Sequence, residues 1–189
     1  MWILLTNAPT NSLVKAFSQF SQSQVVDFSI LTRSELEEVV KKANDTILFW
    51  PIVDCNSLMC FNLVFQTLVQ VSKVTSYSGT KLVLFSSPLP IQPIPGLEYA
   101  AATLAACEGL MESLAVEVEN FPLIIDIGLD PIRSGRLFDS ISNTITTSND
   151  KQAPCRVVVD ESKSKEIIRH KLRSWLEELE DWKFMTTDQ

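Results

Sequence analysis

The residues that could carry metal or nucleophile chemistry are few and scattered. The four cysteines, which include no C-x₂-C pair, are Cys55, Cys60, Cys107 and Cys155. With His170 as the single histidine, neither a metal site nor a disulfide framework is predicted, and we expect buried thiols. Ser87 follows an apolar run, but prolines succeed it where a hydrolase nucleophile is followed by a helix-opening glycine. No catalytic triad is therefore expected.

Apolar runs alternate with amphipathic stretches along the whole chain. Buried strands are predicted at 2–6, 24–28, 46–50, 81–85, 122–128 and 156–159. Helical spacing of apolar residues predicts helices at about 13–20, 32–43, 56–77, 97–120 and 162–183. Asn11 or Ser12 can cap the first helix, and Ser34 with Glu37 fits a capping box for the second. The segment 130–150 is polar and rich in serine and threonine, and we assign it neither helix nor strand.

This order of elements predicts the class of fold. Strands that are near-continuous apolar runs, each followed by a helix, indicate a doubly wound α/β domain with a parallel sheet covered on both faces. We expect a single domain over 1–189, with a strand–helix element at about 155–183 near its end. Ligands of such folds bind at the carboxyl ends of the strands, which directs attention to 7–11, 51–54, 86–96 and 129–135.

Composition and charge exclude several classes of function. The chain has 189 residues with only 5 glycines, the first at Gly79, so no glycine-rich loop lies in its first 78 residues. A net charge of −7 argues against nucleic acid or an anionic membrane surface as partner. We find neither the features of a signal peptide nor an apolar stretch of 18 residues. A cytoplasmic protein is therefore expected.

Residues 81–138 resemble the short-chain dehydrogenase/reductase family. In that family a strand ends in a catalytic serine, a tyrosine follows about a dozen residues later at the start of a long helix, and a lysine stands four residues further on. Here 82–87 resembles the serine strand, 95–99 the approach to the tyrosine, and 130–134 the turn near the nicotinamide. The resemblance implies a Rossmann-like sheet, Ser87 and Tyr99 as a catalytic pair, and Ser134 beside an NAD or NADP cofactor.

The sequence departs from this family where the cofactor and the proton relay would be. The lysine position is Thr103, and a hydroxyl cannot supply the positive charge that lowers the pKa of a tyrosine. The glycines of the phosphate-binding turn fall on Asn7, Asn11 and Leu13. Asp27 stands where the family sometimes holds the adenosine ribose. Without the glycines, we expect Asp27 to be a solvated strand-end acid.

Two further departures concern the walls of the cofactor cleft. A single helix separates the strands at 24–28 and 46–50, where the family has a helix, a strand and a helix, so one outer strand is expected to be missing. The family's Asn-Asn-Ala-Gly turn is replaced by Trp50-Pro51-Ile52-Val53. We expect this segment to place bulk where the nicotinamide ribose would lie.

Three predicted helices are candidates for partner binding. In the family, the helices corresponding to 56–77 and 97–120 form a four-helix dimer interface, which implies a homodimer or heterodimer here. The alternative is that one subunit covers both helices itself. The helix at 162–183 has an apolar stripe and a charge order opposite to that favoured by the helix dipole, so it either binds a protein partner or packs on its own sheet.

These observations lead to two hypotheses about function. The first is a catalytically degenerate member of the short-chain dehydrogenase/reductase fold that acts as a dimerising or scaffolding subunit without a cofactor. The second is an atypical oxidoreductase with NADP or NAD, or a non-redox enzyme. It would act on a small carbonyl or hydroxyl substrate through Ser87 and Tyr99. The missing lysine and glycines favour the first.

Overall fold

The computed structural model describes residues 2–43, 45–53, 58–91, 94–117, 122–127, 135–147 and 156–159. Its elements are, in chain order, β1 (Ile3–Thr6), α1 (Ser12–Ser21), β2 (Gln24–Asp27), the 3₁₀ turn η1 (Phe28–Ile30), α2 (Arg33–Lys42), β3 (Thr46–Trp50), α3 (Leu58–Ser78), β4 (Lys81–Ser86), α4 (Glu98–Glu117), β5 (Leu123–Ile127), α5 (Gly135–Thr147) and β6 (Arg156–Val159). The predicted strands are all present. The predicted helix at 162–183, with His170, and the turn with Ser134 lie outside the described residues.

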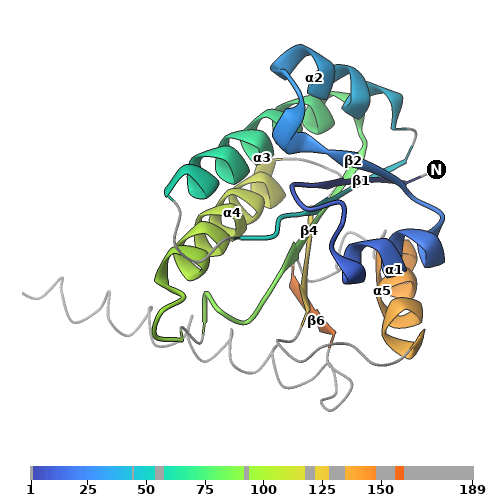
Figure 1. Cartoon of the computed structure of the whole chain (residues 1–189). Helices are drawn as coiled ribbons and strands as arrows, with labels where there is room; N and C mark the ends of the chain where they lie inside the picture. The colour runs from blue at the N-terminus through green and yellow to red at the C-terminus, as the bar shows by residue number, and fades with distance from the viewer. Residues whose placement is uncertain are drawn as a thin grey trace, which may run out of the picture.

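Six parallel strands form one sheet in the order β2-β1-β3-β4-β5-β6. Helices α2, α3 and α4 cover one face, and α1 and α5 cover the other (Figure 1). This is the predicted doubly wound, Rossmann-like α/β fold. Within the described residues β2 forms the edge of the sheet, in agreement with the expected loss of an outer strand. The direction of winding reverses between β1 and β3.

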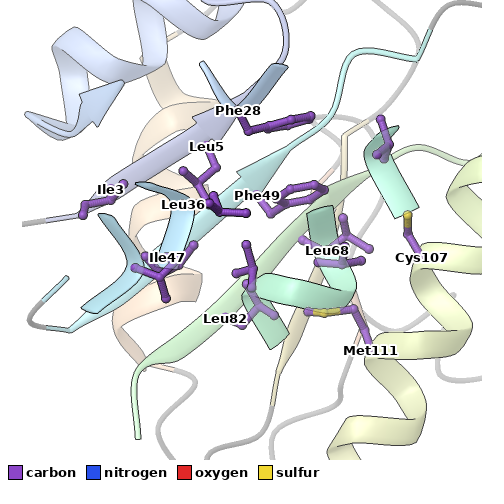
Figure 2. Packing of buried hydrophobic residues seen from close by; sticks show 14 of the residues in the cluster. Ile3, Leu5, Phe28, Leu36, Ile47, Phe49, Leu68, Leu82, Cys107 and Met111 are labelled. Atoms are coloured by element: carbon purple, nitrogen blue, oxygen red, sulfur yellow. The ribbon is translucent and has the colours of Figure 1, made fainter. Parts of the chain in front are cut away.

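The core on the α3/α4 side of the sheet is mainly aliphatic. Leu5, Phe49 and Leu82 from the strands pack against Leu68 of α3 and Met111 of α4 (Figure 2). Successive strand residues point to opposite faces, so their neighbours in sequence supply the second core. Burial on both faces explains why the strands are near-continuous apolar runs.

The core on the α1/α5 side is built around aromatic rings. The ring of Phe17 on α1 makes edge contacts with Trp50, Phe85 and Phe138, at centroid distances of 5.7, 5.5 and 5.5 Å. Trp50 and Phe85 stack at 4.5 Å. Of the segment 50–53, which is expected to add bulk near the nicotinamide ribose, Trp50 therefore places its ring inside this core.

Helix α5 was not expected from the sequence. Its many serines and threonines have modest helix propensity, yet Phe138, Ile141 and Ile145 recur at helical spacing and pack into the α1/α5-side core. Lys81 donates a hydrogen bond from Nζ to the Ile145 carbonyl, at 2.6 Å. Tertiary packing of one apolar stripe accounts for this helix, as it does for most helices in proteins.

The ends of the first two helices follow standard capping chemistry. Asn11, one of the two predicted candidates, caps α1. For α2 the predicted pair is wrong: Thr32, not Ser34, is the N-cap, and Glu35, not Glu37, completes the capping box. Both pairs fit the same spacing, but Thr32 keeps an extended backbone while Ser34 is already helical. The helix therefore begins earlier than the Ser34 cap would require.

Helix α3, the longest described helix, differs from the expectation that the chain has no apolar stretch of 18 residues. By length and composition alone it could cross a membrane, and 33% of its most apolar 18-residue window is buried. It is the one described helix that meets this criterion. In the fold it lies beside α4 over the sheet (Figure 1), and its buried side chains are part of the α3/α4-side core.

Candidate functional site

The ends of β1 and β3 meet at the point where the sheet reverses its winding, which is where ligands bind in doubly wound folds. Asn7 follows β1, and Ile52 follows β3. The Asn7 side chain donates from Nδ2 to the Ile52 carbonyl at 2.8 Å, and its Oδ1 accepts from the Ile52 N–H at 2.8 Å. The two hydrogen bonds tie the ends of the two strands together.

The N-terminus of α1 comes next to this junction and is the place where a dinucleotide fold holds its pyrophosphate. Asn11 Oδ1 accepts hydrogen bonds from the Leu13 and Val14 N–H groups, at 2.9 and 3.4 Å. The donors that a phosphate would use are thus already paired with a side chain. The Leu13 side chain packs against the α1/α5-side core.

Asp27 has a local structural role at the end of β2. Its Oδ1 accepts hydrogen bonds from the Ser29 N–H at 2.9 Å and the Ser29 hydroxyl at 2.6 Å. These bonds cap η1.

Ser87 and Tyr99 lie on either side of the loop that joins β4 to α4. Ser87 Oγ accepts from the Leu89 N–H at 3.3 Å, and Tyr99, in the first turn of α4, is 50% exposed. No hydrogen bond of the described chain joins the two hydroxyls. Thr103 is fully buried and donates to the Tyr99 backbone carbonyl at 2.6 Å, a bond within the helix that leaves the phenol untouched.

The loop after β4 closes over a small apolar cluster. Leu89, Ala100 and Ala101 are buried, and Val53 and Leu97 pack against them. The end of β3 is therefore in contact with the start of α4 through aliphatic side chains. Val53, the last residue of the segment 50–53, makes this contact.

A buried polar cluster was missed by the sequence analysis. Ser86, the last residue of β4, donates a hydrogen bond to Glu108 on α4, and Ser86 is the register partner of Asp126 on β5. All three side chains are buried. Two signals could have revealed them: an aspartate inside the apolar run 123–127, and a glutamate within a helix of small and apolar residues.

Cys107, the neighbour of Glu108 in the sequence, is fully buried. Burial, together with the charge of Glu108, raises the pKa of Cys107 to about 12, so this cysteine stays protonated and unreactive at neutral pH. Among the described residues, no three histidine, cysteine or acidic side chains come together in a group that could hold a metal ion.

Neither a family model nor a curated protein sequence matches this chain. Solved structures do. A short-chain dehydrogenase from Streptomyces avermitilis superposes with a TM-score of 0.66 and 13% identity, covering 100% of this chain and 97% of that one. A bulky-bulky ketone specific alcohol dehydrogenase from Comamonas testosteroni gives 0.65 and 9% over 95% and 84% of the two chains. Acetoin dehydrogenase from Salmonella typhimurium gives 0.63 and 12% over 85% and 96%.

These likenesses show that the chain has the fold of the short-chain dehydrogenases/reductases, as the residues around Ser87 and Tyr99 indicated. The side chains of this chain do not fit the cofactor of that fold. A dinucleotide needs free N–H donors at the start of α1 and close approach of the backbone. Here the Asn11 side chain accepts from the Leu13 N–H, and the Asn7 side chain is bonded to the backbone of Ile52.

Proposed function

We propose that this chain is a catalytically degenerate protein of the short-chain dehydrogenase/reductase fold that acts as a dimerising or scaffolding subunit. The observation that carries the proposal is the pairing of the Asn7 side chain with both backbone groups of Ile52. It occupies the junction of β1 and β3, where an active relative would hold its cofactor.

Cofactor binding would require these internal bonds to be replaced. Each hydrogen bond contributes about 0.5–1.5 kcal/mol net, and each buried group left unpaired costs about 1–3 kcal/mol. A pyrophosphate at the start of α1 would compete with Asn11 for the Leu13 and Val14 N–H groups. No glycine stands in the loop to let the backbone approach the ligand. We infer that neither NAD nor NADP binds with useful affinity.

The environment of Tyr99 supports the same conclusion for catalysis. A tyrosine that relays protons near neutral pH needs a positive charge close to its phenol, because the charge favours the ionised form. Thr103 supplies none and is buried in the helix. The remnant pair Ser87 and Tyr99 therefore lacks the means to act as acid and base.

The outer surface of α3 and α4 supports a role in association. The first turns of α3 expose Leu58, Met59 and Leu63, with Met59 82% exposed. Ala102, Ala105 and Gly109 make an exposed strip of small residues along α4. We call these six residues the α3–α4 outer face. The two helices lie side by side over the same face of the sheet (Figure 1), so one partner can contact both.

Gly109 gives this surface a physical argument for close contact. A glycine inside a helix is destabilising by about 0.5–1 kcal/mol relative to alanine. Outside its chain neighbours and the adjacent backbone of α4, no described atom lies within 4 Å of the position that a Cβ at Gly109 would take, so the packing of the described residues does not require the glycine. Close approach of a helix from a second subunit would require a glycine at this position. We propose a homodimer, or a heterodimer with a related chain, through this face.

Two further parts of the proposal, the classes of partner that we exclude and the compartment, rest on the sequence. The net charge of −7 opposes binding to nucleic acid or an anionic membrane surface, and we place the subunit in the cytoplasm.

Calorimetric titration of the chain with NADH and NADPH, each up to millimolar concentration, tests the central claim. We expect no saturable heat with either, while a dehydrogenase of the same fold, titrated in parallel, binds normally. Micromolar binding would overturn the proposal. So would turnover of a ketone or aldehyde by the wild type that disappears in Tyr99→Phe, which would establish the enzyme hypothesis instead.

A further inference from the structure

Strand β2 is an edge strand of the sheet among the described residues (Figure 1). The Gln24 N–H donates to the Trp2 carbonyl, just before β1, at 3.0 Å. Successive residues of a strand direct their backbone groups to opposite sides, so Gln24 and Val26 bond to β1 while Val25 and Asp27 face outward. In the part of the chain that the structure describes, no residue hydrogen-bonds to the outward N–H groups of Val25 and Asp27.

The β2 edge lacks the sequence features that usually keep an edge strand from pairing with another chain. Edge strands are commonly protected by lysine, proline or a bulge. Residues 23–31 contain no lysine and no proline, and β2 pairs with β1 in an unbroken register. Beyond the end of the strand, Ile30 is 77% exposed. An extended strand can therefore continue the sheet here through its backbone groups.

A second copy of the chain fits this edge in the antiparallel direction. A two-fold axis beside Val25 places this residue opposite its own copy, where each N–H can donate to the other carbonyl. Asp27 is the only charged residue of the strand. In this register it lies opposite Ser23 of the second copy, so no two carboxylates face each other across the strands.

Helix α2 adds charge complementarity to the antiparallel arrangement. It packs over the sheet through Leu36 and Val40 and is the outermost helix on the α3/α4 side (Figure 1). Its first two turns contain Arg33 and three glutamates, whereas its last turn contains Lys41 and Lys42. The two-fold axis places the α2 helices of the two copies antiparallel in one layer. The acidic start of each helix then lies toward the basic end of the other.

We propose that a second copy of the chain binds along β2 and α2, which joins the two sheets into one continuous sheet. The proposal rests neither on the α3–α4 outer face nor on the absence of a cofactor. Because β2 has only four residues, the contact forms few hydrogen bonds and is weaker than the one proposed for α3 and α4. A chain with two self-complementary faces assembles beyond a dimer at high concentration.

Sedimentation equilibrium of the Ala105→Glu chain tests the β2 contact without the helical one. From tens of micromolar to about one millimolar, we expect a change from monomer to dimer. Val25→Pro in the same background removes an outward N–H and none that bonds to β1. It should weaken the association by about tenfold or more, because the symmetric contact loses two hydrogen bonds. Val25→Thr, the matched control, keeps the N–H and a β-branched side chain and should associate as before.

A charge exchange on α2 gives a second readout that leaves the backbone of β2 intact. One chain carries Glu37→Lys and Glu38→Lys, the other carries Lys41→Glu and Lys42→Glu, and both carry Ala105→Glu. Each chain alone should associate less than the Ala105→Glu parent, because charges of the same sign then face each other. Mixed in equal amounts, the two chains should form the mixed dimer in preference to either homodimer.

Three results would overturn the proposal. The first is a parent chain that stays monomeric at about one millimolar. The second is equal association by Val25→Pro and Val25→Thr, with urea unfolding showing that both are folded. The third is the absence of a preference for the mixed dimer in the charge exchange, which would also decide the matter if Val25→Pro did not fold.

Discussion

The junction of β1 with β3 has polar groups that are paired within the chain, whereas the α3–α4 outer face has apolar side chains that are exposed. At the junction, the amide of Asn7 and the backbone of Ile52 pair with each other, and Asn11 takes the first N–H groups of α1. On the outer face, Leu58 and Met59 are exposed, and no described atom outside the adjacent part of α4 lies close enough to Gly109 to require a glycine there. A ligand at the junction would find few hydrogen-bonding groups to pair with. Burial of the exposed apolar side chains against a partner would instead stabilise a complex.

The largest expected effect is the loss of association in Ala105→Glu. A carboxylate placed in the dry centre of the proposed interface would have to lose its water without a cation to replace it. We expect the dimer to weaken by about a hundredfold or more, so that light scattering at tens of micromolar gives the mass of a monomer.

Ala16→Glu is the matched control for that variant. Ala16 is exposed on α1, on the other side of the sheet, and its substitution should leave the dimer intact. A wild-type chain that is monomeric under these conditions, or equal masses for both variants and the wild type, would contradict the assignment of the α3–α4 outer face as a homodimer interface.

Asn7→Ala should affect the other region alone. The substitution leaves the N–H and the carbonyl of Ile52 without the partner they have in the wild type, which should cost about 1–3 kcal/mol of unfolding free energy. Urea denaturation measures this loss, and the dimer should persist. Asn143→Ala, at an exposed position of α5, should change stability by less than about 0.5 kcal/mol. Equal losses from the two variants would show that the Asn7 bonds contribute nothing specific.

Gly109→Ala should give the smallest effect, with opposite signs in the monomer and the dimer. In the monomeric Ala105→Glu background, alanine should stabilise the chain by about 0.5–1 kcal/mol, because the helix loses a flexible residue and the new Cβ meets no described atom outside the adjacent part of α4. In the otherwise wild-type chain, the same methyl group should weaken association.

Gly96→Ala provides the contrast for this test. Its surroundings are equally open, but its φ of +86° is unfavourable for alanine, so this substitution should destabilise the chain. If Gly109→Ala leaves the dimer as strong as before, the helices do not approach each other at Gly109.

The sequence by itself determined the order of the six strands and of helices α1 to α4. The run 46–50 is apolar on both sides of the strand, which favours a parallel sheet covered on both faces. Local chemistry also narrowed the cap of α1 to Asn11 or Ser12, because the Asn11 side chain and the N–H groups it accepts from are only two and three residues apart. The resemblance around Ser87 and Tyr99 was enough to predict the fold that the solved structures share.

Only the tertiary structure decided which polar residues far apart in the sequence pair with each other. Asn7 and Ile52 are 45 residues apart, and Ser86 and Glu108 are 22 apart, so no local pattern could pair them. Helix α5 exists because its apolar stripe meets Phe17, a contact that outweighs the weak propensity of its own residues. Pairings between distant segments depend on the packing of the whole sheet, and the sequence encodes them only through the fold.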